Sequence, residues 1–434
     1  HMPSFLTSSL FKNSSIYIIT DGISQAIPFL LLPLISHYLS PADYGIITNF
    51  NVLFAILSII CFMTTAGVLP VIYYKKDKEA LRLYISNMLF LNTIVTVGCL
   101  VMTLIFNRTI DHLIQLPLFY QILCLVTVWF ASITNLNMIL WRCEERPWSF
   151  GKYKIALSSL NIIITIWFVV ILLWGWQGRV YSQCIAIIVF GAISLWILIR
   201  REYFVLKISK QDMLHVLFFA LPLLPHALSF WLKSGINKIY LTDMCSLSEN
   251  GLYSVALTWG GALSMFFLAF NNAYAPYLYK KLSFWETQSY DTTYQDKIRL
   301  VKMTYICLLG TLLISFLAYW VSLFIIKLTY APSYFASIRF LPWAIMDVAF
   351  NGCYWMFVCF LYHTLKTKLL GAITFSLSIA QIGLSYVSIL WLGSTGVAIS
   401  AAFISFITFI IIAYVAMRSY RLPWGLKCTN KTVS

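Results

Sequence analysis

Two lysines lie five residues apart in an otherwise apolar stretch, "FWLKSGINKIYL" at residues 230–241. An ammonium group at the centre of a lipid bilayer costs roughly 3 kcal/mol on insertion scales, so a charge in such a stretch is a candidate for function. Lys233 and Asn237 are four residues apart and share one face of a helix, while Ser234 and Lys238 share another. We therefore expect a segment whose second half is polar on more than one side.

Two interpretations of these lysines remain open. Lys233 lies about 20 residues after the start of its apolar segment, which at ~1.5 Å per residue brings it close to the far headgroups, where a lysine can snorkel. Pro222 and Pro225 precede it, and proline can tilt or kink a helix. A kink would keep Lys233 deeper, beside a water-filled cleft. Lys238 lies still closer to the end of the segment.

Two carboxylates also fall within apolar segments. Asp21 is followed four residues later by Gln25, and Asp347 is followed four residues later by Asn351. Each pair forms a polar stripe on one helix face. A carboxylate inside a membrane span can serve as a proton or ion site, contact a polar substrate or pair with a basic residue. All three interpretations remain open here.

The elements that position these residues follow from composition. Of the 434 residues, 60% are hydrophobic and 10% are charged, and the mean hydropathy is +0.82. Soluble domains carry about 25% charged residues. The composition therefore predicts an all-α integral membrane protein. The ten cysteines show no metal-type spacing, so we expect no zinc site, disulfide framework or cofactor.

A spanning helix needs about 20 mostly apolar residues. The apolar runs predict twelve spans, with barrel strands excluded by their length of about 10 residues. The runs cover residues 14–36, 45–73, 84–106, 117–140, 155–175, 180–199, 213–240, 252–276, 301–327, 338–362, 369–391 and 396–417.

The basic residues predict the orientation of these spans. All but six of the 30 lysines and arginines fall in the connections on the side of the N-terminus. Positive charge is retained on the cytoplasmic side during insertion. We therefore predict that both termini are cytoplasmic. The net charge of +15 is spread over short loops, which disfavours a nucleic-acid partner.

The two halves of the sequence resemble each other. "LSPADYG" at 39–45 and "LSENGLY" at 247–253 follow spans one and seven with an offset of 208. A second pair of echoes, near the ends of the halves, has an offset of 218. These echoes predict an N-terminal six-helix bundle at 1–212, a C-terminal one at 213–417 and a cytoplasmic tail at 418–434. Parallel repeats of this kind are a transporter architecture.

Three stretches carry a family resemblance: "PFLLLPLISHYLSPADYG" at 28–45, "LPLLPHALSF" at 221–230 and "LSENGLYSVA" at 247–256. With twelve spans, they resemble the Wzx-type O-antigen and polysaccharide-unit flippases of the multidrug/oligosaccharidyl-lipid/polysaccharide (MOP) exporter superfamily. The resemblance implies two bundles that alternate access across a cleft. It implies transport of an oligosaccharide linked to undecaprenyl diphosphate from the inner to the outer leaflet of the bacterial cytoplasmic membrane.

The resemblance also suggests roles for the polar residues. Lys233 and Lys238 are the candidates for the diphosphate, and Asp21 and Asp347 are the candidates for H⁺ or Na⁺ coupling or for sugar contact. Where the family commonly has an Asp-Arg pair, this chain has Asn237 followed by lysine. The remaining candidates for substrate contact are Gln25, Asn51, Asn237 and Asn351. An asparagine can equally join helices. Polysaccharide polymerase and chain-length proteins are the expected neighbours.

Two other functions compete with transport of a lipid-linked glycan. A polysaccharide polymerase would be an enzyme, but the predicted outer loops are short and no HExxH, GxSxG or P-loop pattern occurs in the sequence. A drug or cation antiporter of the same superfamily would share the fold. The basic seventh span disfavours it. We therefore expect a transporter without catalytic residues.

Overall fold

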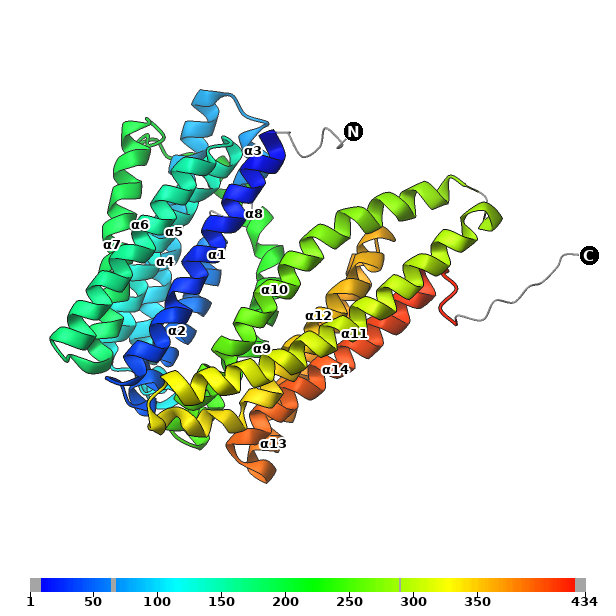
Figure 1. The fold of residues 1–434 in the computed structure, drawn as a ribbon. Helices are drawn as coiled ribbons and strands as arrows, with labels where there is room; N and C mark the ends of the chain where they lie inside the picture. The colour runs from blue at the N-terminus through cyan, green and yellow to red at the C-terminus, as the bar shows by residue number, and fades with distance from the viewer. Residues whose placement is uncertain (1–8, 64–67, 289, 426–434) are drawn as a thin grey trace, which may run out of the picture. The chain divides into compact units, whose positions relative to one another are not determined.

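The computed structural model describes residues 9–63, 68–288 and 290–425, and among these residues it is helical without strands. Figure 1 shows the elements in order. They are α1 (Ser9–Ser36), α2 (Pro41–Phe62), α3 (Leu69–Tyr73), α4 (Lys78–Ile114), α5 (Leu118–Cys143), α6 (Pro147–Thr165), the π-helix η1 (Ile166–Ile171), α7 (Gly175–Arg200), α8 (Lys210–Ala220), the 3₁₀-helix η2 (Leu221–Leu223), α9 (Leu224–Met244), α10 (Leu247–Glu286), α11 (Tyr290–Thr329), the 3₁₀-helix η3 (Pro332–Arg339), α12 (Leu341–His363), α13 (Thr367–Leu392) and α14 (Ser394–Ser419).

Most of these helices can span a membrane. Within the described residues, ten are long and apolar enough, and an eleventh span results if the bent pair Lys210–Leu223 and Ala227–Met244 counts as one. The apolar part of α1, Gly22–Ser36, is shorter than a full span. The chain is therefore a multi-pass membrane protein, as its composition predicts. Twelve spans and cytoplasmic termini stay predictions.

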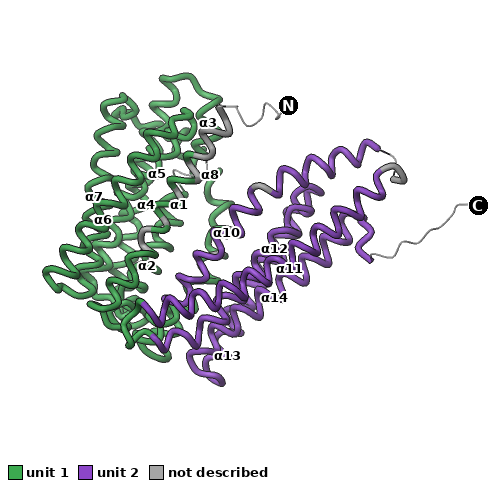
Figure 2. The backbone as a smooth tube through the Cα atoms, viewed as in Figure 1, with its two compact units in different colours: residues 1–254, 329–334 green, residues 255–328, 335–434 purple. Residues whose placement is uncertain are grey.

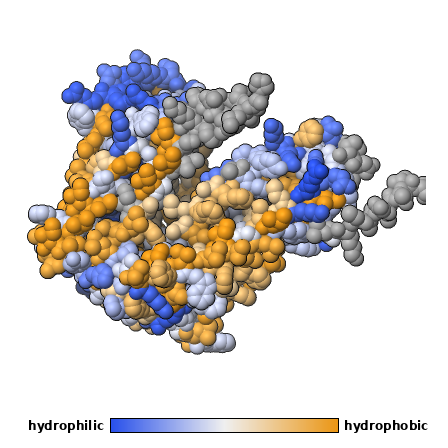
Figure 3. All heavy atoms as spheres, viewed as in Figure 1, coloured by the Kyte–Doolittle hydropathy of each residue, from blue (hydrophilic) through white to orange (hydrophobic). Residues whose placement is uncertain are grey.

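The outer surface of the helices suits lipid. On α11 the exposed fractions of Ile306, Leu309 and Phe324 are 68%, 68% and 67%. Figure 3 shows apolar residues over the helices and hydrophilic residues at one end of the N-terminal helices. Large apolar patches are rare on soluble monomers but are the normal lipid-facing surface of a membrane protein.

The helices form two compact units (Figure 2). Unit 1 contains residues 1–254 and 329–334, and unit 2 contains residues 255–328 and 335–434. In unit 1, α5 packs on α7, α1 on α6 and α2 on α5, while in unit 2, α14 packs on α12 and α13. The domain boundary at residue 212 that the sequence repeat suggests stays a prediction.

A proline-containing break interrupts the seventh predicted span. Pro222 lies within η2, and Pro225 occupies the first turn of α9. The helix axis bends by 42° between Lys210–Leu223 and Ala227–Met244. Proline removes a backbone donor and its ring clashes with the preceding turn, which explains the bend. The predicted kink before Lys233 is confirmed.

The helix starts of α2 and α10 share one capping hydrogen bond, from the third residue of the helix to a serine hydroxyl. Ser40 and Asp43 form a capping box, because each side chain accepts a hydrogen bond from the backbone N–H of the other. At α10, the Ser246 hydroxyl accepts from the backbone N–H of Glu249 at 3.2 Å. The equivalent positions are therefore 206 residues apart. This structural match differs by two residues from the match of sequence letters at an offset of 208, because the letters align Leu39 with Leu247 whereas the caps align Ser40 with Ser246.

Two glycines bring these helix starts into backbone contact within unit 1. A Cβ on Gly45 would lie 2.1 Å from the Leu247 carbonyl oxygen, and a Cβ on Gly251 would lie 1.9 Å from the Pro41 carbonyl oxygen. The two contacts have the same form and share the offset of 206. The crossing of α2 and α10 is therefore symmetric, because each repeat places a glycine against the backbone of the other. Neither glycine position has room for a side chain.

Candidate functional site

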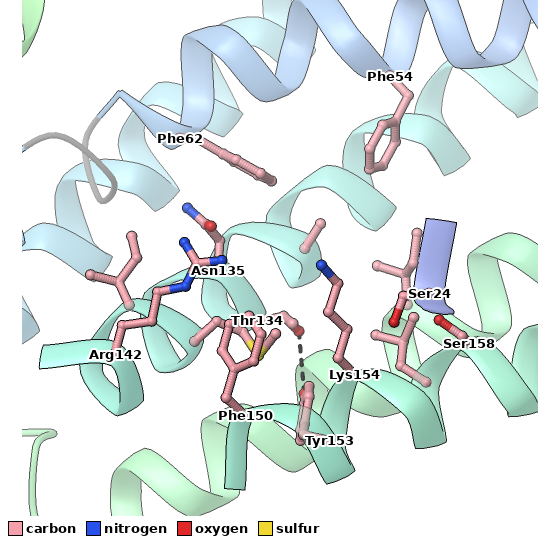
Figure 4. A pocket seen from close by; sticks show the side chains of 15 residues that line it. Ser24, Phe54, Phe62, Thr134, Asn135, Arg142, Phe150, Tyr153, Lys154 and Ser158 are labelled. Carbon is pink, nitrogen blue, oxygen red and sulfur yellow. Dashed lines mark hydrogen bonds between the residues drawn. The ribbon is translucent and has the colours of Figure 1, made fainter. Parts of the chain in front are cut away.

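Unit 1 contains a cavity of about 470 Å³ between α1, α2, α5, α6 and α7 (Figure 4). It lies toward the end of the unit where α5 ends and α6 begins. Two basic side chains, four small polar ones and a set of apolar residues form its wall. The described lining residues are Ser24, Phe54, Phe62, Ala131, Thr134, Asn135, Met138, Ile139, Arg142, Phe150, Tyr153, Lys154, Leu157, Ser158 and Ile187.

Arg142 and Lys154 are the charged residues among the described residues of this wall. Arg142 lies in the last turn of α5, and Lys154 lies at the start of the third turn of α6. The buried ring of Phe150 is close to both cations: its centroid lies 4.7 Å from the Arg142 Cζ and 5.7 Å from the Lys154 Nζ. Cation–π contacts of this kind hold long side chains in place. Figure 4 shows both side chains extending into the cavity.

The turn between α5 and α6 positions the two cations. Glu145 has a φ of +53°, in the left-handed region, and Pro147 starts α6. Glu144 forms an ion pair with Arg201, lies 3.8 Å from Arg146 and accepts a 3.2 Å hydrogen bond from the Tyr203 hydroxyl. This network fixes the end of α5 and therefore the direction of the Arg142 side chain.

Tyr203 lies in the connection after α7 and takes part in the same network. Burial raises the pKa of its hydroxyl, and the neighbouring Glu144 carboxylate raises it further. The hydroxyl therefore stays protonated and able to donate at physiological pH.

The rest of the wall can bind polar groups. Asn135, Thr134, Ser158 and Ser24 offer an amide and three hydroxyls. Tyr153 lies 3.4 Å from the Thr134 hydroxyl. A second cavity of about 470 Å³ adjoins the first and is lined by Pro70, Tyr74, Asn135, Ile139, Arg142 and Cys143. Arg142 and Asn135 line both cavities, so one guanidinium can reach a ligand in either.

Comparisons with known proteins give the family. The sequence pattern of the family described as polysaccharide biosynthesis proteins matches residues 10–281, which is more than half of the 434 residues. This chain belongs to that family. The matched range contains every residue of the unit 1 cavity.

Two relatives from Haemophilus influenzae are similar to this family member. "Lsg locus putative protein 1" is 25% identical over 285 residues, covering 63% of this chain and 67% of the relative. An "uncharacterized membrane protein" is 24% identical over 283 residues, covering 63% of this chain and 66% of the relative. The chain thus matches about two thirds of the length of these curated relatives.

Solved structures show the fold of this polysaccharide biosynthesis protein. The lipid II flippase MurJ in an inward closed conformation has a TM-score of 0.68 at 13% identity, covering 92% of this chain and 87% of that one. An inward-facing multidrug resistance MATE transporter of the MOP superfamily has a TM-score of 0.61 at 15% identity, covering 92% and 98%. The resemblance to a polysaccharide family is confirmed by the matched family pattern, and the fold is that of the MurJ and MATE structures.

The predicted lysines of this family member lie on α9, outside the described lining of either cavity. Both are half-buried. Lys238 lies on the face of α9 that meets α2, since Trp231, seven residues before it, donates to the Val52 carbonyl at 3.1 Å. Among the described residues, the Lys238 ammonium has no ion pair. Asn237 is 1% exposed, and its amide lies 3.5 Å from the Tyr253 hydroxyl.

The other predicted residues are divided between the units. In unit 2, Asn351 donates to the Asp347 carboxylate at 3.1 Å and lies 3.2 Å from the Ser405 hydroxyl, which also donates to Asp347. In unit 1, Asn51 accepts from Gln183 at 3.0 Å. The side chains of Asp21 and Gln25, on α1, lie outside the described part of the chain.

Sequence reasoning missed Arg142 and Lys154. The sequence pattern predicts both as loop charges that orient the spans. A usable signal was the spacing around Phe150, which precedes Lys154 by four residues and therefore shares its helix face. The contact of Arg142 with the same ring could not be predicted, because it depends on how α5 turns into α6.

Proposed function

We propose that the protein is a flippase for an oligosaccharide linked to undecaprenyl diphosphate. It moves this lipid, an O-antigen or capsule repeat unit, from the inner to the outer leaflet of the bacterial cytoplasmic membrane by alternating access. The observation that carries the proposal is the pair of cations, Arg142 and Lys154, in a cavity of a polysaccharide biosynthesis protein with the fold of the MOP transporters.

The chemistry of the cargo explains the cavity. A diphosphate carries several negative charges that hydrocarbon excludes. Arg142 offers a planar fork that binds two phosphate oxygens, and Lys154 offers a mobile point charge. The pair can therefore hold a diphosphate and still release it. The end of unit 1 that holds the cavity faces the cytoplasm in the predicted orientation, where such lipids are assembled.

The polar part of the wall suits the first sugars. Asn135 and Ser158 can each donate and accept hydrogen bonds. Ring faces at Phe54, Phe62 and Tyr153 complete the wall. The volume of each cavity falls within the range of about 300–1,000 Å³ that is typical of small-molecule sites. The lipid tail can remain in the bilayer during transport.

Coupling and partners are part of the same proposal. Asp347, held by an amide and a hydroxyl, is the candidate in unit 2 for a H⁺ or Na⁺ site or a sugar contact, and Asp21 is the candidate in unit 1. Lys233 and Lys238 are further candidates for the diphosphate. Polysaccharide polymerase and chain-length proteins are the proposed neighbours in the membrane. The protein itself moves its substrate without altering it.

A drug or cation antiporter is the second candidate, since MATE multidrug transporters share the fold. The cavity disfavours it, because Arg142 and Lys154 would repel a cationic drug. An antiporter of this kind would change drug sensitivity and leave surface polysaccharide unchanged when the gene is deleted.

The test of the proposed function is genetic. In the source strain lacking this gene, wild type, Arg142→Gln, Lys154→Gln and the control Lys152→Gln are expressed at matched levels. Lys152 is exposed and lies outside the cavity lining. We expect deletion to trap lipid-linked units inside, wild type and the control to restore surface polysaccharide, and both cavity variants to fail. Normal surface polysaccharide after deletion would refute the flippase.

A further inference from the structure

A third cation lies inside unit 1, away from the described cavity. Arg179 is in the second turn of α7, and its Nη1 donates to the Asn161 amide oxygen at 3.0 Å. The same nitrogen lies 3.4 Å from the hydroxyls of Thr165 and Ser182. Among the described residues, no carboxylate pairs with Arg179. A guanidinium held only by neutral oxygens keeps its full charge for a ligand.

The two hydroxyls are arranged to accept from Arg179. Thr165 and Ser182 are fully buried and lie 2.7 Å from each other. Thr165 donates to the Asn161 carbonyl at 2.7 Å, and Ser182 donates to the Arg179 carbonyl at 2.8 Å. A guanidinium has five N–H donors. The hydrogen bonds described here use Nη1, so Nε and Nη2 remain for an anion.

A polar face of α6 connects Arg179 with the cavity. Lys154, Ser158, Asn161 and Thr165 follow one another at intervals of three or four residues and so share one face. Lys154 and Ser158 line the cavity, and Asn161 bonds to Arg179. Seven residues separate Lys154 from Asn161, a rise of about 10 Å along the helix.

The facing helix, α7, carries two polar residues and one cavity residue on one face. Arg179, Gln183 and Ile187 succeed each other by four residues along α7, and Ile187 lines the cavity. Gln183 donates to Asn51 of α2 at 3.0 Å. α6 and α7 pack against each other in unit 1 (Figure 1). Polar groups therefore continue from the cavity to Arg179 along α6, and Gln183 adds a polar group beside Arg179 on α7.

A purely structural role explains these observations less well. An asparagine or glutamine could join α6 to α7 through the same oxygens without bringing a charge into the bundle. A cation in a membrane span is costly when no carboxylate compensates it, and it commonly marks a substrate or ion pathway.

We propose that Arg179, positioned by Asn161, is a second diphosphate-binding site along the transport path. It receives the diphosphate after this leaves Arg142 and Lys154. The inference rests on the proposed flippase function and adds a defined second position to it. Two sites of moderate affinity, one after the other, keep the diphosphate in contact with basic and polar side chains while it moves along unit 1.

The test is Asn161→Asp in the full-length protein. The carboxylate would replace the amide oxygen that accepts from Arg179 at 3.0 Å, preserving the helix contact while neutralising the guanidinium. Asn107→Asp on α4 is the charge control; it adds a carboxylate there and removes the donation of the Asn107 amide to the Leu104 carbonyl. Thermal stability and binding of undecaprenyl diphosphate are measured in lipid nanodiscs. Export is measured as surface polysaccharide in the deletion strain.

We expect Asn161→Asp to be as stable as wild type and to bind undecaprenyl diphosphate within about threefold of wild type, because the first site is intact. Export should fall at least roughly tenfold. Arg179→Lys, which keeps the charge but loses the fork geometry of the contacts, should retain more export than Asn161→Asp. A merely structural arginine predicts the opposite order.

If the Asn161→Asp variant exports as much polysaccharide as wild type, the proposal of a second site is wrong. Loss of binding in this variant would also overturn it, because Arg179 would then belong to the first site. Failure of wild type itself to bind undecaprenyl diphosphate would instead overturn the proposed function, and the second site with it.

Discussion

The crossing of α2 and α10 makes a sharp prediction about Gly45→Ala. The added Cβ would lie 2.1 Å from the Leu247 carbonyl oxygen, whereas ordinary contacts start at 3.4 Å. The helices must therefore separate by about 1.3 Å, the difference between these distances. Separation strains the buried hydrogen bond from Asn250 to Asn49, now 2.7 Å long. Overpacking costs about 1–3 kcal/mol and a strained buried hydrogen bond about 1 kcal/mol more.

The assay is thermal unfolding of purified protein in one detergent. A loss of about 2–4 kcal/mol corresponds to a fall in Tm of roughly 5–15 °C for a unit of this size. Gly98→Ala on α4 is the control, since a Cβ there meets nothing within 4 Å. Alanine is the better helix former by about 0.5–1 kcal/mol, so this control should match or exceed wild type. If the Tm of Gly45→Ala equals or exceeds that of wild type, the backbone contact between α2 and α10 is not as close as described.

Three further predictions concern the cavity turn, the end of α14 and the carboxylate of unit 2. Glu144→Gln leaves Arg201 without its carboxylate, so unfolding measurements should show a loss of about 1–3 kcal/mol; an unchanged Tm would contradict the network. Burial, with the nearby Glu286 as a second cause, raises the pKa of the Tyr420 hydroxyl to about 12. Because the unfolded chain releases this proton near pH 10, the free energy of unfolding should fall as the pH rises from 10 to 12. Tyr420→Phe should reduce this loss of stability between pH 10 and 12. A variant whose stability has the same pH profile as wild type would show that another group is responsible. Asp347→Asn keeps hydrogen-bonding capacity but removes the charge, so Tm should change little while any dependence of export on a H⁺ or Na⁺ gradient disappears; unchanged gradient dependence would exclude this residue from coupling.

The helices and the break in the seventh predicted span could be predicted from local sequence. Apolar runs of about 20 residues correspond to α4, α5, α7, α13 and α14, and the helix start at Pro41 follows from its capping residues. Pro222 and Pro225 predict the bend because proline acts within its own turn. These features depend on residues that are close together in the chain, which is why sequence patterns capture them.

The site could not be predicted to the same extent. Arg142 and Lys154 meet the same ring only because Glu145 reverses the chain in a left-handed conformation. Asp347 meets Ser405 from a helix 58 residues further on. Single-sequence patterns contain no information about which helix faces pack together, so charges near helix ends were interpreted only as topology signals.

The central claim is that Arg142 and Lys154 hold the diphosphate. Its most direct test is equilibrium binding of undecaprenyl diphosphate to the purified protein in lipid nanodiscs, comparing wild type, the Arg142→Gln/Lys154→Gln double variant and Lys152→Gln. We expect the control to match wild type and the double variant to bind roughly 30–150-fold more weakly, from about 2–3 kcal/mol of lost charge-assisted hydrogen bonding. Equal affinities for all three proteins would contradict the account.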